Sequence, residues 1–332
     1  MSLLITGTSG FIGSSLLLAL KSVSNRRITA VVRSKADQDS AANFNIVMSA
    51  INQYSDWSEI LCGVNTVIHL AGSVHVMRNP VTDPLTEFRS ANTTATINLA
   101  QQAATAGVCR LIYLSSIKVN GETTALGYPF KAEDTLNSPC HLREQSPDSD
   151  ELDPYAQSKQ EAEQGLRSVA QQTGLEIVII RPPLVYGAGV KGNFLQIMSW
   201  LHKGIPLPLG NIHNQRSLVA LPNLIDLITT CIDHPAAANK TFLVSDGEDL
   251  STTELLQRLS HALGKPARLL PIPQSWLETT LNLLGKHAIA QRLCGNLQVD
   301  ISKTRDLLGW TPPVSVDEAL RQTAQAYLKN HH

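Results

Sequence analysis

The segment Thr6-Gly7-Thr8-Ser9-Gly10-Phe11-Ile12-Gly13 follows a short apolar run and opens an amphipathic one. This spacing matches the glycine turn between a first strand and a first helix, where a dinucleotide binds. In such a turn Gly7 permits a tight bend, Gly10 lets backbone approach a pyrophosphate, and Gly13 allows close helix packing. The amides of the helix N-terminus, at Phe11 and Ile12, would face the phosphates. A glycine turn that merely packs is the alternative reading.

Short apolar runs alternate with longer amphipathic segments through the first half of the chain. The runs are continuous and rich in β-branched residues, as expected of parallel strands covered on both faces. Strands are predicted at Leu3–Ile5, Ile28–Val32, Thr66–Leu70, Leu111–Leu114 and Ile177–Ile180, and helices at Phe11–Ser22, Pro84–Ala106 and Pro154–Thr173. The alternation predicts an α/β fold, a doubly wound parallel sheet of the Rossmann type.

The pattern changes after Arg181, where proline- and glycine-rich loops and short helices are expected up to Lys240. One more strand is predicted at Phe242–Val244, and helices at Thr252–Leu263, Trp276–Leu284 and Asp317–Leu328. We expect a dinucleotide-binding domain over residues 1–181, rejoined by a strand near 241–245. A smaller, mostly helical and partly interleaved substrate domain would span 182–332. The polar segment Glu122–Asp153 has little periodicity and is predicted to be a lid or partly disordered.

Composition excludes several classes of partner. The chain of 332 residues has 27 Lys+Arg against 28 Asp+Glu, so it has no basic field for nucleic acid or a membrane surface. No apolar run approaches the roughly 20 residues of a membrane span. Met1-Ser2-Leu3-Leu4-Ile5 lacks a basic segment or cleavage site. The five scattered cysteines include no C-x-x-C pair, which favours free thiols over disulfides or a metal site. We predict a cytoplasmic protein that binds no metal.

Tyr155-Ala156-Gln157-Ser158-Lys159 has the spacing of an acid–base pair at the start of a helix. Four residues apart, Tyr155 and Lys159 share one helix face, where the ammonium would lower the pKa of the phenol. Ser116 ends a predicted strand at the edge of the sheet where ligands collect, and its hydroxyl could bond the reacting oxygen. Backbone capping is the alternative role for Ser116. We predict that Ser116, Tyr155 and Lys159 are catalytic.

The end of the second strand bears on the choice of cofactor. An acid there would bind the ribose of NAD, whereas an arginine accommodates the 2′-phosphate of NADP. The sequence is Val31-Val32-Arg33-Ser34-Lys35, without an acid until Asp37. NADP(H) bound by Arg33 and Ser34 is therefore predicted. NAD(H) is the alternative if Arg33 is a solvated surface residue.

Five motifs in order resemble the extended short-chain dehydrogenase/reductases, and within them the NAD(P)-dependent nucleotide-sugar epimerase/dehydratase family. They are Thr6 to Gly13, Leu114-Ser115-Ser116, Tyr155-x-x-x-Lys159, Arg181-Pro182-Pro183-Leu184-Val185-Tyr186-Gly187 and Leu308-Gly309-Trp310. Further segments resemble a bacterial polysaccharide-biosynthesis subgroup that contains UDP-glucose 4-epimerases and UDP-4-keto-6-deoxy-hexosamine 4-reductases. They are His69 to Gly72, Val74 to Met77, Ser115 to Glu122, Val190 to Phe194 and Arg216 to Val219.

The resemblance implies roles for matching residues. Ser116 and Tyr155 would contact the C4 oxygen of the sugar, and Lys159 would also hold the nicotinamide ribose. It places Leu70, Ala71, Gly72 and Pro182 at the cofactor, and Lys118, Asn193, Phe194, Arg216 and Arg292 at the substrate. Asn193 and Arg216 would bind the nucleotide diphosphate. Arg292 would be either a second diphosphate ligand or a surface residue. No aspartate follows the third strand at Ser49-Ala50-Ile51, so apolar contacts are expected at adenine.

The resemblance also narrows the reaction. Family dehydratases carry Asp-Glu where this chain has Ile117-Lys118, so dehydration is not expected. The main prediction is 4-keto reduction of a UDP-linked, 6-deoxy-N-acetylhexose in surface-polysaccharide synthesis. A UDP-hexose 4-epimerase with retained NAD is the alternative. A non-catalytic dinucleotide sensor and an enzyme for apolar ketones are the less favoured readings. Family members often dimerise through the helices equivalent to Pro84–Ala106 and Pro154–Thr173, which makes a homodimer possible.

Overall fold

The computed structural model describes residues 1–23, 26–33, 45–48, 51–73, 83–135 and 153–330. Its large sheet has seven strands in the order β3-β2-β1-β4-β5-β6-β9, and neighbouring strands are parallel. The strands are β1 (Ser2–Thr6), β2 (Arg27–Val32), β3 (Asn45–Met48), β4 (Thr66–His69), β5 (Arg110–Leu114), β6 (Glu176–Arg181) and β9 (Lys240–Leu243). The predicted α/β fold with a doubly wound parallel sheet is confirmed.

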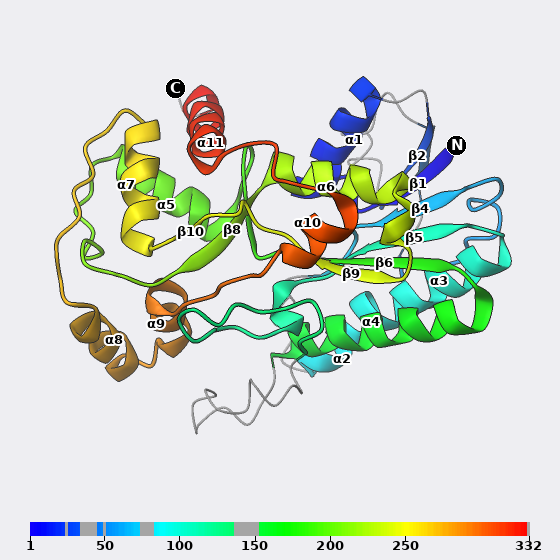
Figure 1. Ribbon diagram of the computed structural model, residues 1–332, viewed down its shortest axis with the longest axis horizontal. Helices are drawn as coiled ribbons and strands as arrows, with labels where there is room; N and C mark the ends of the chain where they lie inside the picture. The colour runs from blue at the N-terminus through cyan, green and yellow to red at the C-terminus, as the bar shows by residue number, and fades with distance from the viewer. Residues whose placement is uncertain (24–25, 34–44, 49–50, 74–82, 136–152, 331–332) are drawn as a thin grey trace.

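Helices cover both faces of this sheet (Figure 1). One face carries α1 (Phe11–Val23), α6 (Leu221–Asp233) and α10 (Ser302–Leu308), and leucines of α1 and α6 lie in the same apolar core as strand side chains. The other face carries α3 (Ala95–Thr105) and α4 (Pro154–Thr173), with their own core. Burial on both faces explains why the strands are continuously apolar.

Two helical segments differ from the prediction. The predicted helix Pro84–Ala106 is divided into α2 (Pro84–Phe88), a π-helical turn η2 (Arg89–Thr94) and α3. Apolar periodicity alone does not reveal this widened turn, because six residues are too few to establish a period of their own. Only loops and short helices were expected between residues 181 and 240. The structure has a longer helix there, α6, with 13 residues of which eight are buried.

A smaller, second layer of structure lies beyond the large sheet (Figure 1). Its three-stranded sheet has the order β10-β8-β7, from β10 (Asp249–Leu250), β8 (Arg216–Ala220) and β7 (Leu184–Tyr186). The helices around it are α5 (Gly192–His202), α7 (Thr252–Ala262), α8 (Gln274–Leu283), α9 (His287–Cys294) and α11 (Val316–Asn330). Because α6 and β9 follow residue 181 yet pack with the large sheet, the domain boundary at residue 181 stays a proposal.

The segment after β5 was expected to be a lid or partly disordered, and part of it is ordered in the structure. The 3₁₀-helix η3 (Ile117–Val119) follows β5. Further along the chain, Phe130 is buried and forms an isolated parallel β-bridge with Val299. The amide of Thr124 donates to the carbonyl of Asn296 at 3.0 Å. The chain from 122 to 135 is therefore held against the segment that follows α9. Residues 136–152 lie outside the described residues.

Within the part of the chain that the structure describes, none of the helices combines the length and apolarity of a membrane span.

Candidate active site

The carboxyl ends of the central strands bring the predicted residues to one edge of the sheet. Thr6 of β1 pairs with His69 of β4, and Leu114 of β5 pairs with Ile180 of β6. The glycine turn, the segment Leu70–Gly72, Ser116 and Pro182 follow these strand ends directly. Strand order reverses between β1 and β4, which is where open α/β sheets bind their ligands.

The glycine turn is packed too tightly for side chains at two of its positions. A Cβ on Gly7 would lie 2.6 Å from the amide nitrogen of Ala71, and φ at Gly7 is 74°. A Cβ on Gly13 would lie 2.2 Å from the carbonyl oxygen of Gly7. Gly10 is exposed at the start of α1, beside half-buried Phe11 and Ile12. This cradle, with a helix N-terminus behind it, fits the pyrophosphate of a dinucleotide.

The other predicted cofactor residues lie around this turn. Leu70 and Ala71 are half-buried and Gly72 is exposed. Pro182 is buried, and its carbonyl accepts a hydrogen bond from the amide of Ile117 at 3.0 Å. Arg33 is exposed directly after β2, as its surface alternative requires. Ser34 lies outside the described residues.

Tyr155 is placed by the start of α4. The Asp153 carboxylate caps the helix by accepting from the amide of Tyr155 at 3.0 Å, and Pro154 occupies the first turn. The ring of Tyr155 packs edge-on against Phe88, with 5.8 Å between centroids. Burial raises the pKa of Tyr155, whereas a hydrogen bond with Ser116 and the charge of Lys118 lower it. Ser116 and Tyr155 are thus neighbours, as expected, and Lys118 is the cation identified as acting on the phenol.

Lys159 is buried one turn further along α4. Its ammonium donates to the carbonyl of Leu114 at 3.0 Å and lies 4.6 Å from the ring centroid of Tyr113. A Cβ on Gly72 would lie 3.2 Å from the Lys159 Nζ, so the ammonium borders the predicted cofactor segment. Burial lowers the pKa of Lys159 to about 8, and Glu163 acts to raise it. The lysine can therefore gain or lose its charge close to neutral pH.

Lys118 occupies a different setting from the predicted one. Its ammonium bonds the carboxylates of Glu122, at 2.7 Å, and Asp153. These ion pairs tie the turn after Ser116 to the cap of α4. Substrate contact by Lys118 stays a prediction, and it would require the ammonium to share its donors with these two acids.

Of the residues predicted to bind the diphosphate, the structure brings Arg216 and Arg292 close together. Arg216, at the start of β8, is half-buried and donates to the carbonyl of Gly295 at 2.9 Å. Burial lowers the pKa of Arg216, and the nearby positive charge of Arg292 lowers it further. Two adjacent cations form a suitable site for a diphosphate. Asn193 is exposed at the start of α5, whereas the ring of Phe194 is buried against Tyr186, and the substrate contacts of both stay predictions.

Two buried polar residues were given no role by the sequence analysis. Asn92, in the π-helical turn, accepts from the amide of Ser73 at 2.8 Å and donates to the Ser158 hydroxyl at 3.1 Å. His69 lies between the hydroxyls of Thr6 and Thr96, at 2.7 and 3.0 Å. Burial lowers the pKa of His69 to about 3, which keeps the ring neutral. A polar residue in a helix pattern normally indicates a solvent face, so Asn92 gave no signal.

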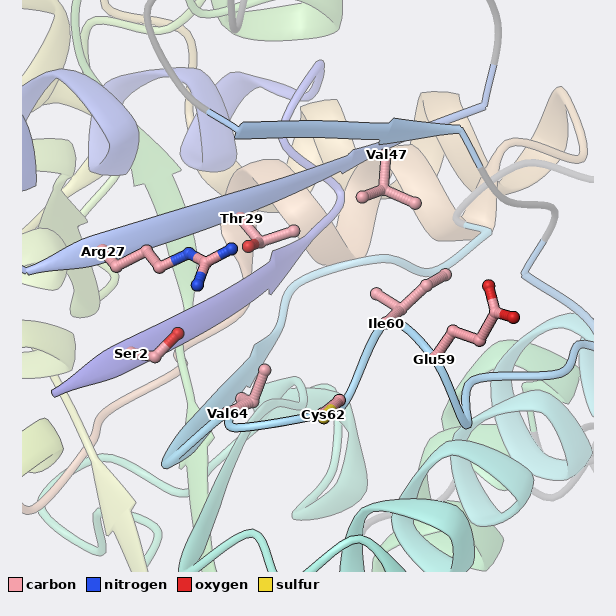
Figure 2. Close-up of a pocket in the computed structure, with 8 residues that line it drawn as sticks. All are labelled: Ser2, Arg27, Thr29, Val47, Glu59, Ile60, Cys62 and Val64. Carbon is pink, nitrogen blue, oxygen red and sulfur yellow. The ribbon is translucent and has the colours of Figure 1, made fainter.

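A hollow also lies towards the opposite, amino-terminal edge of the sheet (Figure 2). Its lining comes from the starts of β1 and β2, from β3 and from the turns before β4: Ser2, Arg27, Thr29, Val47, Glu59, Ile60, Cys62 and Val64. Because Ser116 follows the carboxyl end of β5 and Tyr155 lies beside Ser116, this hollow is separate from the candidate active site.

Comparison with known proteins identifies the family of the chain. The model of the NAD dependent epimerase/dehydratase family matches residues 3–245. A UDP-glucose 4-epimerase of Vibrio cholerae is 46% identical over 329 residues, which cover 99% of this chain and 96% of that protein.

Solved structures share the fold. A UDP-glucuronic acid 4-epimerase from Bacillus cereus in complex with NAD has a TM-score of 0.78 at 19% identity, over the whole of both chains. A UDP-glucose 4-epimerase from Thermotoga maritima with UDP-glucose has a TM-score of 0.74 at 19% identity, again over the whole of both chains. From its glycine turn, its tyrosine–lysine helix and these matches, the chain belongs to the NAD-dependent epimerase/dehydratase family of extended short-chain dehydrogenase/reductases.

Proposed function

We propose that this protein is a UDP-hexose 4-epimerase that retains NAD. The observation that carries the proposal is the 46% identity to a UDP-glucose 4-epimerase along almost the full length of both chains. This was the alternative in the sequence analysis, and the comparisons favour it over the 4-keto reduction predicted first. Dehydration is disfavoured by the Ile117-Lys118 sequence beside Ser116.

Tyr155 would move the proton at the C4 oxygen of the sugar. Its hydroxyl lies beside Ser116, so both groups can bond one substrate oxygen. The glycine turn would hold NAD, which would supply the acceptor for the C4 hydride and the donor for its return to the other face of the sugar. Tyr155 takes the hydroxyl proton as the hydride leaves and gives it back as the hydride returns. Ser116 holds the oxygen in place throughout.

Lys159 would orient the cofactor and stabilise the ionised tyrosine. Its ammonium is buried between the carbonyl of Leu114 and the segment at Gly72. A buried positive charge at this place acts in a low dielectric, where it favours a phenolate more strongly than it would in water. The contact of Lys118 with the cap of α4 adds a second cation near the phenol.

We propose NAD as the cofactor in place of the NADP predicted from Arg33. The family that the chain matches is NAD-dependent. Epimerisation also needs the same cofactor to be reoxidised in each turnover, which favours a dinucleotide that stays bound.

Denaturing the purified protein should release NAD at close to one equivalent per chain, as identified by mass spectrometry. The same preparation should interconvert UDP-glucose and UDP-galactose without added cofactor, because hydride removal and return balance. A protein that is purified empty, and that oxidises added NADPH with a UDP-linked 4-keto-6-deoxy sugar, would overturn the epimerase proposal and restore the reductase.

Replacing Arg216 by methionine should raise KM for the UDP-sugar about tenfold or more, because a charge-assisted bond to phosphate is lost. The value of kcat should change less, since Arg216 would lie away from the reacting carbon. Exposed Arg268 provides the control, and Arg268→Met should leave KM unchanged. An Arg216→Met enzyme with an unaltered KM would exclude this arginine from the diphosphate site.

A further inference from the structure

Glu163 and Arg181 form a fully buried ion pair behind the catalytic residues. Glu163 lies on α4 one turn beyond Lys159, and Arg181 ends β6; their exposed fractions are 0% and 1%. The pairing is bidentate, with Nη2 to Oε2 at 2.6 Å and Nε to Oε1 at 2.8 Å. The hydroxyl of Ser115 donates to the same carboxylate at 2.6 Å. The pair therefore joins α4 to the ends of both β5 and β6.

Arg181 extends this connection to the segment that carries Glu122. Its Nη1 donates to the side-chain oxygen of Asn120 at 2.9 Å and to the carbonyl of Asp134 at 2.8 Å. The amide of Asn120 donates in turn to the carbonyl of Lys131 at 2.7 Å. One guanidinium thus fixes both ends of the 120–134 segment to the strand that precedes Pro182.

A buried ion pair is not required for the stability of a fold. The free energy needed to remove two charges from water can exceed the free energy that their attraction contributes. Replacing a buried ion pair by apolar residues of similar size therefore often leaves the stability unchanged or raises it. The position of Glu163 suggests a further use, because its carboxylate lies on the same helix face as Lys159. The groups that face Lys159 come from several elements: Glu163 on α4, Tyr113 on β5, His69 on β4 and, through Glu163, Arg181 on β6.

Most of these neighbours keep one charge state near neutral pH. Burial lowers the pKa of His69 to about 3 and raises the pKa of Tyr113 well above its usual value, so both rings stay neutral. Burial lowers the pKa of Lys159, and the negative charge of Glu163 opposes this by raising the pKa.

We propose that Glu163 and Arg181 are a positioning pair that fixes α4 against β5, β6 and the 120–134 segment, and that the Glu163 carboxylate held in this pair keeps the Lys159 ammonium charged. The pair acts through Lys159 and touches neither sugar nor cofactor. The inference rests on the proposed function only in assigning the reaction to Tyr155 and Lys159. Its test therefore includes a measurement that needs no substrate.

The titration of Lys159 can be followed by NMR on protein labelled with ¹³Cε-lysine, with Lys159→Arg to assign the signal. The Lys159 midpoint should lie near pH 8 in the parent protein. In Glu163→Gln it should fall by about one pH unit or more, because an adjacent opposite charge is lost. The activity readout has the same sign: protonated Lys159 is the active form, so the alkaline fall in kcat should begin at a lower pH.

Arg110→Met is the matched control, because Arg110 is a buried, ion-paired arginine at the far end of β5. It should lower Tm but leave the Lys159 midpoint in place. A Glu163→Gln protein that loses Tm with the midpoint unmoved would show a purely structural pair and overturn the proposal.

If Glu163→Gln does not fold, the Arg167→Gln variant tests the same coupling, because half-exposed Arg167 bonds the Glu163 carboxylate at 3.0 Å. Removing this cation should raise the Lys159 midpoint, and an unchanged midpoint would contradict the coupling. If these variants shift the Lys159 midpoint but the parent protein has no epimerase activity, the proposed function is wrong and the coupling of Glu163 to Lys159 still holds.

Discussion

Replacing Tyr155 by phenylalanine is expected to lower kcat by about 10²- to 10⁴-fold, the usual contribution of a positioned acid–base group. The change removes only the hydroxyl that lies beside Ser116, and the ring keeps its edge-on packing against Phe88. KM for the UDP-sugar and the retained dinucleotide should therefore change little. Steady-state interconversion of UDP-glucose and UDP-galactose, with Tm as a check on folding, measures the effect.

Tyr186→Phe is the matched control for Tyr155→Phe. It also removes one buried tyrosine hydroxyl, which donates to Asp246 at 2.8 Å. Losing that bond should cost about 1 kcal/mol of stability, with kcat unchanged. If both variants kept the parent kcat, Tyr155 would not be the proton-transfer residue, and the mechanism would need another group near Ser116.

Gly13→Ala is expected to abolish retention of the dinucleotide and to destabilise the protein by about 3 kcal/mol or more. The new Cβ would lie 2.2 Å from the Gly7 carbonyl oxygen and 2.8 Å from the Cα of Thr8. Both obstacles are backbone, so relief requires opening the turn that holds the cofactor. Chemical denaturation and the amount of NAD released per chain report the two effects.

Gly10→Ala separates cofactor binding from folding. Its Cβ would approach the same Gly7 oxygen only to 3.2 Å, which a small adjustment can relieve. Stability should stay near that of the parent, while less NAD is retained because the side chain occupies the approach to the pyrophosphate. A Gly13→Ala protein that holds a full equivalent of NAD would contradict the role given to the turn.

The strands and the glycine turn could be predicted because their signals are local. Strand β1 and the turn occupy one continuous segment, and the continuous apolar runs of β4, β5 and β6 follow from burial on both faces. Tyr155 and Lys159 were recognised for the same reason, since a spacing of four places two residues on one helix face. Element boundaries within Pro84–Ala106 were missed because the π-helical turn has no periodic signal.

The environments of the site residues were harder to predict. Arg33 is exposed, which fits a phosphate ligand and a solvated surface residue alike, so its role stays a prediction. Lys118 bonds Asp153, 35 positions away, a partner that the sequence did not indicate, and its predicted substrate contact stays a prediction. The ring of Phe194, assigned to the substrate as well, belongs to the core beside Tyr186. Charge and burial at these positions depend on partners that spacing does not identify.

The parallel sheet, the turn suited to a dinucleotide and the tyrosine–lysine helix could be predicted from sequence alone, because each depends on residues close together in the chain. The folded chain was needed to show that Arg216 lies by Arg292, that Asn92 joins Ser73 to Ser158, and that Glu163 meets Arg181 behind Lys159. These contacts join residues from different elements. A chain with many possible carboxylate–guanidinium pairs selects among them only when packing places two partners together and excludes water from both.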